Sequence, residues 1–174
     1  IIDLQKSIQW YSKAAEKGHI NAQFNLGNCY FNGIGVTKDI RKAASLYKMP
    51  AEEGLVAAQY NLGLSYTFGE LAATDSLAAF FWFSKAAEQG HAAAEFNLGN
   101  CYFYGKAVKK DLAKAEEWYM ISAQKGYAAS QTALGLISEE RKDYETAVSW
   151  YLLAADQGYS IAQYNLGLMY DEGK

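Results

Sequence analysis

Hydrophobic and polar positions along this chain follow a helical spacing that restarts at a fixed interval. Residues 22–36, AQFNLGNCYFNGIGV, carry small and apolar residues at three- and four-residue spacing and end in a glycine-rich loop. A Leu-Gly pair in this stretch recurs at intervals of 36, 36, 36 and 32 residues: Leu26-Gly27, Leu62-Gly63, Leu98-Gly99, Leu134-Gly135 and Leu166-Gly167. Such a period is typical of stacked supersecondary units rather than of one globular core.

Each unit is predicted to hold two helices joined by a loop. The first helix of the first full unit covers about 21–32, and the loop 33–36 follows, where glycine allows a positive φ. Asp39 lies where the second helix begins, since a carboxylate there meets free N–H groups, and Gly54 closes that helix. Equivalent residues open the later second helices: Asp75, Asp111 and Asp143.

The periodicity divides the chain into units that we expect to form one repeat domain over 1–174. A helix over 3–17 precedes the first full unit, and the shorter fourth unit is expected to have a tight turn at 140–142. The boundaries are a half-unit 1–18, units 19–54, 55–90, 91–126 and 127–158, and a half-unit 159–174. Because the chain starts and stops inside a unit, we expect a fragment of a longer protein. Its half-units leave apolar strips without a polar cap, which would allow end-to-end self-association.

The second helices repeat a large side chain beside a small one. One position is occupied by Trp10, Leu46, Trp82, Trp118 and Trp150, and the next by Tyr11, Tyr47, Phe83, Tyr119 and Tyr151. A small residue lies three positions before each tryptophan position, as close helix packing requires. The glycine of each Leu-Gly pair costs about 1 kcal/mol of helix propensity relative to alanine. Its recurrence therefore predicts that it lets a partner helix approach.

Pro50 stands where the other units have alanine or serine inside a second helix. Proline there removes a backbone hydrogen bond and costs about 3 kcal/mol or kinks the helix. Two interpretations stay open, namely a hinge that reshapes the surface between the first two units, and a kink tolerated near a helix end.

Together these features resemble the Sel1-like repeat. The resemblance rests on Leu26, Gly27, Tyr30, the Gly-x-Gly-Val loop at 33–36, Asp39, Ala43-Ala44 and Gly54, and it covers essentially the whole chain. It implies an all-α fold, a right-handed α/α superhelical solenoid of helix pairs similar to tetratricopeptide repeats. It also implies a scaffold or adaptor that brings other proteins together, not an enzyme. The second unit departs from the pattern at Glu70-Leu71, which changes local loop geometry.

Composition narrows the partners further. The net charge of −3 and the pI near 5.4 do not favour binding to nucleic acid. The chain has no run of 18 apolar residues, so we expect no membrane insertion, and residues 1–18 are not expected to be a signal peptide. Cys29 and Cys101 occupy one repeat position two units apart, beyond disulfide reach. Both are expected to be reduced, which favours a cytoplasmic protein.

The residues that usually carry chemistry are not arranged for it. His19 and His91 are equivalent loop residues, and one His and one Cys per alternate unit cannot supply the ligands of a metal site. Neither cysteine has a histidine at helical spacing to act as its base, and the pair Glu139-Glu140 is expected to be solvated. The glycine loop has neither the preceding strand nor the Lys-Ser/Thr of a phosphate loop. We therefore expect no enzyme activity, no metal and no cofactor.

The first helices carry a series of amides on one face. Asn21, Asn25, Asn28 and Asn32 recur at i, i+4, i+7 and i+11. In a tetratricopeptide-like solenoid this face is concave, and stacking would align Asn25, Asn61, Asn97 and Asn165 into a ladder for a peptide backbone. The predicted partner-binding residues are Asn21, Asn25, Asn28, Tyr60, Asn61, Leu64, Phe96, Asn97, Asn100, Leu136, Tyr164, Asn165 and Leu168. Alternatively, the asparagines cap or bridge adjacent helices and bind nothing.

The leading hypothesis is a protein–protein interaction scaffold that binds a peptide segment or a folded partner through this concave surface. The alternative is a spacer or regulatory segment attached to a catalytic or membrane domain. A third hypothesis, a hydrolase, lacks the spacing of nucleophile and base that it requires.

Overall fold

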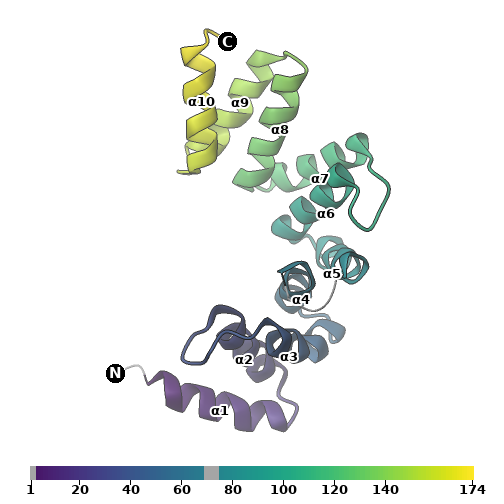
Figure 1. The fold of residues 1–174 in the computed structure, drawn as a ribbon, viewed down its shortest axis with the longest axis vertical. Coiled ribbons are helices and arrows are strands. Elements are labelled where there is room, and N and C mark those ends of the chain that lie inside the picture. Colours follow the sequence, from purple (N-terminus) through teal and green to yellow (C-terminus); the bar gives the residue numbers. More distant parts are fainter. Residues whose placement is uncertain (1–2, 69–74) are drawn as a thin grey trace. The chain divides into compact units, whose positions relative to one another are not determined.

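The computed structural model describes residues 3–68 and 75–174, which form ten helices and no strand (Figure 1). The predicted all-α class is therefore confirmed. The helices are α1 (Leu4–Glu16), α2 (Ile20–Asn32), α3 (Ile40–Glu52), α4 (Val56–Phe68), α5 (Ser76–Glu88), α6 (Ala92–Tyr104), α7 (Leu112–Gln124), α8 (Ala128–Glu140), α9 (Tyr144–Ala155) and α10 (Ser160–Asp171). The expectation for the loop at Glu70-Leu71 concerns residues outside these described ranges.

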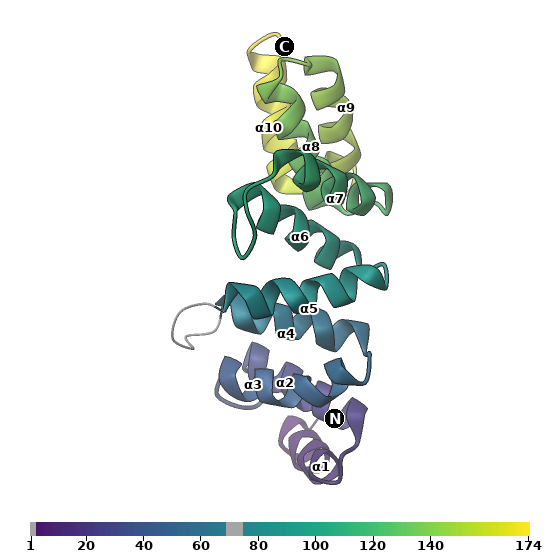
Figure 2. The same ribbon diagram turned by 90° about the vertical axis from the view of Figure 1, so that its right-hand side faces the viewer.

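The helices belong to two compact units. The N-terminal unit, Ile1–Gln89, holds α1 to α5, and the C-terminal unit, Gly90–Lys174, holds α6 to α10. Within each unit, consecutive helices pack against one another (Figure 2). The even-numbered helices are the first helices of the repeats and the odd-numbered ones are the second helices. The organisation as one domain over the whole chain stays a prediction.

The second helices begin at aspartates, as the sequence predicts. Each aspartate is the N-cap, and its carboxylate accepts a hydrogen bond of 2.9–3.2 Å from the backbone N–H three residues later: Asp3, Asp39, Asp75, Asp111 and Asp143. His19 and His91 do the same for α2 and α6, where each Nδ1 accepts a backbone N–H at 3.3 Å. The two histidines therefore satisfy N–H groups that a helix start leaves unpaired.

In the first four Leu-Gly pairs, the glycine lies against an aromatic ring of the following helix. A Cβ placed on Gly27 or Gly63 would come within 2.6 Å of the ring of Tyr47 or Phe83. Tyr119 and Tyr151 leave even less room at the equivalent glycines of α6 and α8. The predicted reason for the recurring glycine is therefore confirmed, because any larger residue would push the second helix away.

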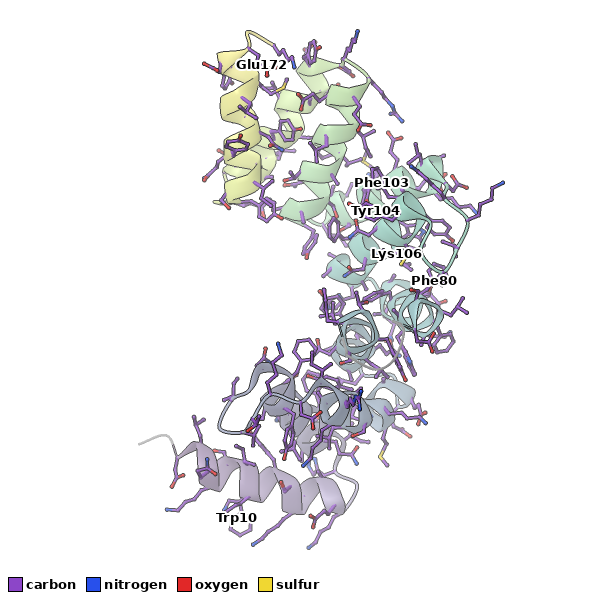
Figure 3. All side chains as sticks on the ribbon, in the orientation of Figure 1. Trp10, Phe80, Phe103, Tyr104, Lys106 and Glu172 are labelled. Atoms are coloured by element: carbon purple, nitrogen blue, oxygen red, sulfur yellow. The ribbon has the colours of Figure 1, made fainter. Side chains whose placement is uncertain are left out.

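The structure also decides which aromatic position of the second helix is buried. Tyr47 and Tyr151 are fully buried, and Phe83 and Tyr119 nearly so. The preceding tryptophan position lies at the edge of the packing, and Trp10 is 66% exposed and points away from the helices that follow α1 (Figure 3). The tyrosine position, rather than the tryptophan position, thus lies at the centre of each complete helix pair.

A glutamine hydrogen bond links four of the first helices to the second helix before them. The Nε2 atom donates to the carbonyl of an alanine eight residues earlier, at 3.1–3.3 Å, in Gln23, Gln59, Gln131 and Gln163. In α6 the same position is Glu95, which is buried and forms an ion pair with Lys125 at the end of α7. The repeats are therefore joined by backbone-directed polar contacts as well as by apolar packing.

Pro50 does not interrupt its helix. α3 runs without a break from Ile40 to Glu52, and the proline ring is buried close to the helix end. The helix then closes with a hydrogen bond of 2.9 Å from the Leu55 N–H to the Pro50 carbonyl. A helix that continues without a break through Pro50 supports neither the hinge nor the kink that the sequence suggested.

The glycine contact generates a matched pair of predictions. Gly99→Ala places a methyl group against the buried ring of Tyr119 and 3.2 Å from the Ala115 carbonyl oxygen. Overpacking of this kind costs about 1–3 kcal/mol, so we expect a net loss of unfolding free energy despite the better helix propensity. Gly167→Ala meets no atom within 4 Å and is expected to stabilise the chain by up to about 1 kcal/mol. Urea unfolding followed by circular dichroism measures both, and equal effects would contradict the packing role.

Candidate functional site

A cavity of about 390 Å³ opens beside the first helices of the C-terminal unit. It is lined by residues of α6, α8 and α10, together with Tyr119 of α7 and Tyr159 at the start of α10. The lining side chains include Phe96, Asn100, Tyr104, Leu136, Glu140 and Ile161. Figure 3 shows Tyr104 beside Phe103 at the C-terminal end of α6. We call this cavity the groove.

The groove has a packed wall and exposed apolar side chains. Phe96 packs between the rings of Tyr119 and Tyr127, with centroid distances of 5.7 and 5.5 Å. Other lining residues are open to solvent: Tyr104 is 64%, Leu136 47% and Ile161 52% exposed. A preformed apolar hollow with a few polar groups is the usual form of a site that takes up apolar side chains.

A smaller cavity of about 210 Å³ adjoins the groove. It is lined by Phe103, Leu112, Ile137, Glu140 and Arg141, of which Phe103, Ile137 and Glu140 also line the groove. The two cavities therefore share a wall at the end of α8.

The charge of Arg141 is already matched within the protein. Its guanidinium donates two hydrogen bonds, of 2.7 and 2.6 Å, to the two carboxylate oxygens of Glu116. This pairing holds the pKa of the Glu116 carboxyl below its usual value. Arg141 is thus committed to a partner on α7.

Several of the predicted amides are hydrogen-bonded inside the protein. The hydroxyl of Tyr47 donates to the Asn28 Oδ1 at 2.7 Å, and the Asn61 Nδ2 donates to the same oxygen at 3.0 Å. In the C-terminal unit, Tyr119 donates to the Asn100 Oδ1 at 2.8 Å. Burial raises the pKa of both tyrosines well above its usual value, so they remain hydroxyl donors. These contacts are of the bridging kind that the sequence left open as the alternative.

The structure brings together only part of the predicted partner-binding set. Phe96, Asn100 and Leu136 line the groove. The Asn97 Nδ2 instead donates to the Ala93 carbonyl within its own helix at 2.8 Å. The remaining predicted residues of α10 do not line the groove: Tyr164, Asn165 and Leu168. Those of the N-terminal unit lie on α2 and α4: Asn21, Asn25, Asn28, Tyr60, Asn61 and Leu64. A ladder through both units stays a prediction.

Sequence reasoning left three important groove residues out of its predicted set. Tyr104 and Glu140 are the fourth members of the amide-face series in α6 and α8, and Ile161 is the first member in α10. The spacing therefore places them on the correct face, although the predicted set does not include them.

The sequence also contains a sign of the role of Asn100. Two repeats with tyrosine at the buried ring position, Tyr47 and Tyr119, have an asparagine at the facing position, Asn28 and Asn100. The second repeat has Phe83 and, facing it, Leu64.

The described residues contain neither a cluster that could hold a metal ion nor a helix that could cross a membrane. Within 3–68 and 75–174 no three His, Cys, Asp or Glu side chains gather closely enough to hold a metal ion. Burial raises the pKa of the Cys101 thiol to about 11, so it is protonated at neutral pH. In the same ranges, none of the helices is both long enough and apolar enough to cross a membrane.

Comparison with known families accounts for the whole repeat pattern. The model of the Sel1 repeat matches residues 2–19, 20–55, 56–91, 92–127, 128–159 and 160–174. No curated protein matches the chain.

Solved structures show the same fold. A Sel1 repeat protein from Oxalobacter formigenes is 35% identical over 99% of this chain and 72% of its own, with a TM-score of 0.85. The protective antigen c5321 of uropathogenic Escherichia coli, which displays an SLR fold, is 36% identical over 99% of this chain, with a TM-score of 0.84. This chain spans only 37% of that antigen. The immunity protein Pa5087 of Pseudomonas aeruginosa is 29% identical over 89% of this chain and 59% of its own, with a TM-score of 0.60. The predicted Sel1-like solenoid is thereby confirmed.

The Asn100–Tyr119 contact can be tested by a replacement that occurs naturally in the second repeat, the pair Leu64 and Phe83. Asn100→Leu removes the acceptor of a nearly buried hydroxyl, which costs about 1–3 kcal/mol. The double variant Asn100→Leu/Tyr119→Phe recreates the Leu64–Phe83 pair, so we expect it to regain most of the unfolding free energy. A urea-denaturation double-mutant cycle measures the coupling. A double variant no more stable than Asn100→Leu alone would show that Asn100 has no bridging role.

Proposed function

This chain belongs to the Sel1 repeat family, and from that membership we propose that it is an interaction scaffold whose groove binds a peptide segment or a protruding part of a folded partner. Sel1 repeats are commonly protein-interaction modules, and the family is generally non-catalytic. The observation that carries the proposal is the groove itself, where a packed aromatic wall meets exposed apolar side chains. The partner would cover Tyr104, Leu136 and Ile161.

The physical argument is the cost of leaving these side chains in water. Burying apolar surface contributes roughly 25 cal/mol per Å², and a partner residue placed in the groove would bury surface on both molecules. The wall would not need to reorganise, because Phe96 and Tyr119 are already packed. A preformed site pays less entropy on binding than one that must be ordered.

The amides would have a smaller part than the sequence indicated. In the C-terminal unit the Oδ1 of Asn100 already accepts the Tyr119 hydroxyl, and Asn97 bonds its own helix. Apolar and aromatic side chains would therefore supply most of the affinity. Polar groups of the groove would serve mainly to orient the partner.

A single charge in the groove tests this proposal. Leu136→Asp places a carboxylate in the apolar mouth and is expected to abolish capture of partners from a lysate of the source organism. Leu153→Asp is the matched control, because Leu153 is 51% exposed on α9 and does not line the groove. Circular dichroism establishes that both variants are folded like the parent.

The outcomes separate the candidate functions. A partner kept by the parent and Leu153→Asp but lost by Leu136→Asp places binding in the groove. Partners retained equally by all three proteins would move the site elsewhere. If none of the three captured a partner, the spacer or regulatory segment would become the better account.

Self-association is a second candidate, and an observation on α10 favours it. Gly167 has no neighbour within 4 Å, whereas the equivalent glycines of α2, α4, α6 and α8 each contact an aromatic ring. A second copy could present such a ring, with exposed Tyr164 and Tyr170 nearby. We expect the sedimentation coefficient to rise with concentration in the parent and to stay constant in Gly167→Glu. A concentration-independent monomer would exclude this candidate.

A further inference from the structure

We propose that the groove selects peptide segments in which a lysine or arginine lies next to a bulky apolar residue. The inference rests on the proposed function and adds the chemistry of the partner. Its evidence is the position of one carboxylate, Glu140, in the lining of both the groove and the smaller cavity, whose other shared residues, Phe103 and Ile137, are apolar.

The acidic character of the chain belongs to its C-terminal unit. Residues 90–174 contain 11 Asp and Glu against eight Lys and Arg, a net charge of −3, whereas residues 1–89 contain eight of each. The unit that contains the groove therefore attracts cationic segments and disfavours anionic ones.

Glu140 is the only charged side chain that lines the groove. In the C-terminal unit, all of which is described, its carboxylate has no ion-pair or hydrogen-bond partner. Arg141 pairs with Glu116, and Lys174 pairs with Glu139 and Glu172, whereas the exposed Lys142 forms no ion pair with Glu140. A negative charge in the lining is therefore left for a ligand.

The position of Glu140 in its helix points the same way. It is the last residue of α8, where the negative end of the helix dipole disfavours a carboxylate. The charge is therefore not expected to stabilise the helix, and replacement of Glu140 by glutamine is expected to leave the fold intact.

Nearby lysines do not neutralise this carboxylate. Lys106 and Lys110, from the loop after α6, lie over the rings of Tyr104 and Phe103 at 5.8 and 5.7 Å from the centroids. Neither lysine lines the groove.

The two cavities explain why the basic residue is paired with an apolar one. Glu140, Phe103 and Ile137 line both the groove and the smaller cavity. A lysine or arginine would lay its apolar stem along Phe103 and Ile137 while its charged head meets Glu140. The neighbouring apolar residue would fill the groove beside Leu136. An acidic residue in the same place would meet a like charge.

A selection from a random peptide library displayed on phage, against the whole immobilised chain, tests this inference. We expect the selected peptides to be enriched in lysine or arginine adjacent to leucine, isoleucine, methionine or an aromatic residue. One selected peptide is then synthesised with its basic residue unchanged, replaced by glutamine and replaced by glutamate. Fluorescence polarisation compares their binding to the parent and to three variants, Glu140→Gln, Glu117→Gln and Leu136→Asp.

The expected effect is that of one exposed ion pair. Glu140→Gln should weaken binding of the basic peptide by about two- to fivefold and leave binding of the glutamine peptide unchanged. High salt should remove the difference in affinity between the parent and Glu140→Gln. Glu117→Gln removes the same charge from an exposed position on α7 outside the groove and should change nothing.

The failures of the inference and of the proposed function are distinguishable. If Leu136→Asp abolishes binding but the pool shows no basic enrichment, or if the two glutamine variants behave alike, the charge preference is overturned and groove binding stands. If selected peptides bind Leu136→Asp as well as the parent, or if the selection yields no binder, both are overturned.

Discussion

In the four complete helix pairs, the contact between the glycine of the Leu-Gly pair and an aromatic ring of the following helix sets the separation of the two helices. A Cβ on any of these four glycines would lie only 2.4–2.6 Å from the facing ring, so the ring contacts the helix backbone directly. The four rings are those of Tyr47, Phe83, Tyr119 and Tyr151. A glycine inside a helix costs about 1 kcal/mol relative to alanine. Burying a whole aromatic side chain removes about 150–250 Å² of its surface from water. The free energy that this burial contributes is larger than the cost of the glycine.

Burying a tyrosine ring creates a second requirement, because its hydroxyl must find a partner. Asn28 and Asn100 accept that hydroxyl, while the unit with Phe83 has Leu64 in the corresponding place. The amide face of the first helices therefore follows partly from the core of the repeat. This explains why an amide pattern that resembles a peptide-binding ladder is also an internal hydrogen-bond network.

The groove depends on the same packing. With Tyr119 fixed against α6, Phe96 is held between two aromatic rings, and the lining from α6, α8 and α10 is set before any partner arrives. In the proposed function, recognition would fall to the side chains that the core does not use, namely Tyr104, Leu136, Ile161 and Glu140. The repeat supplies a common framework, and these positions, which differ from repeat to repeat, would give the groove its own chemistry.

The sequence by itself determined the period, the helix pairs and the aspartate N-caps, because these depend on local hydrogen bonds and on a pattern repeated several times. It also indicated why glycine recurs. Only the tertiary structure decided that the tyrosine position is buried rather than the tryptophan position, that Asn28 and Asn100 bond to tyrosine hydroxyls, and which residues line the groove. Those outcomes depend on side-chain directions and on helices that are distant in sequence, which a linear spacing does not specify.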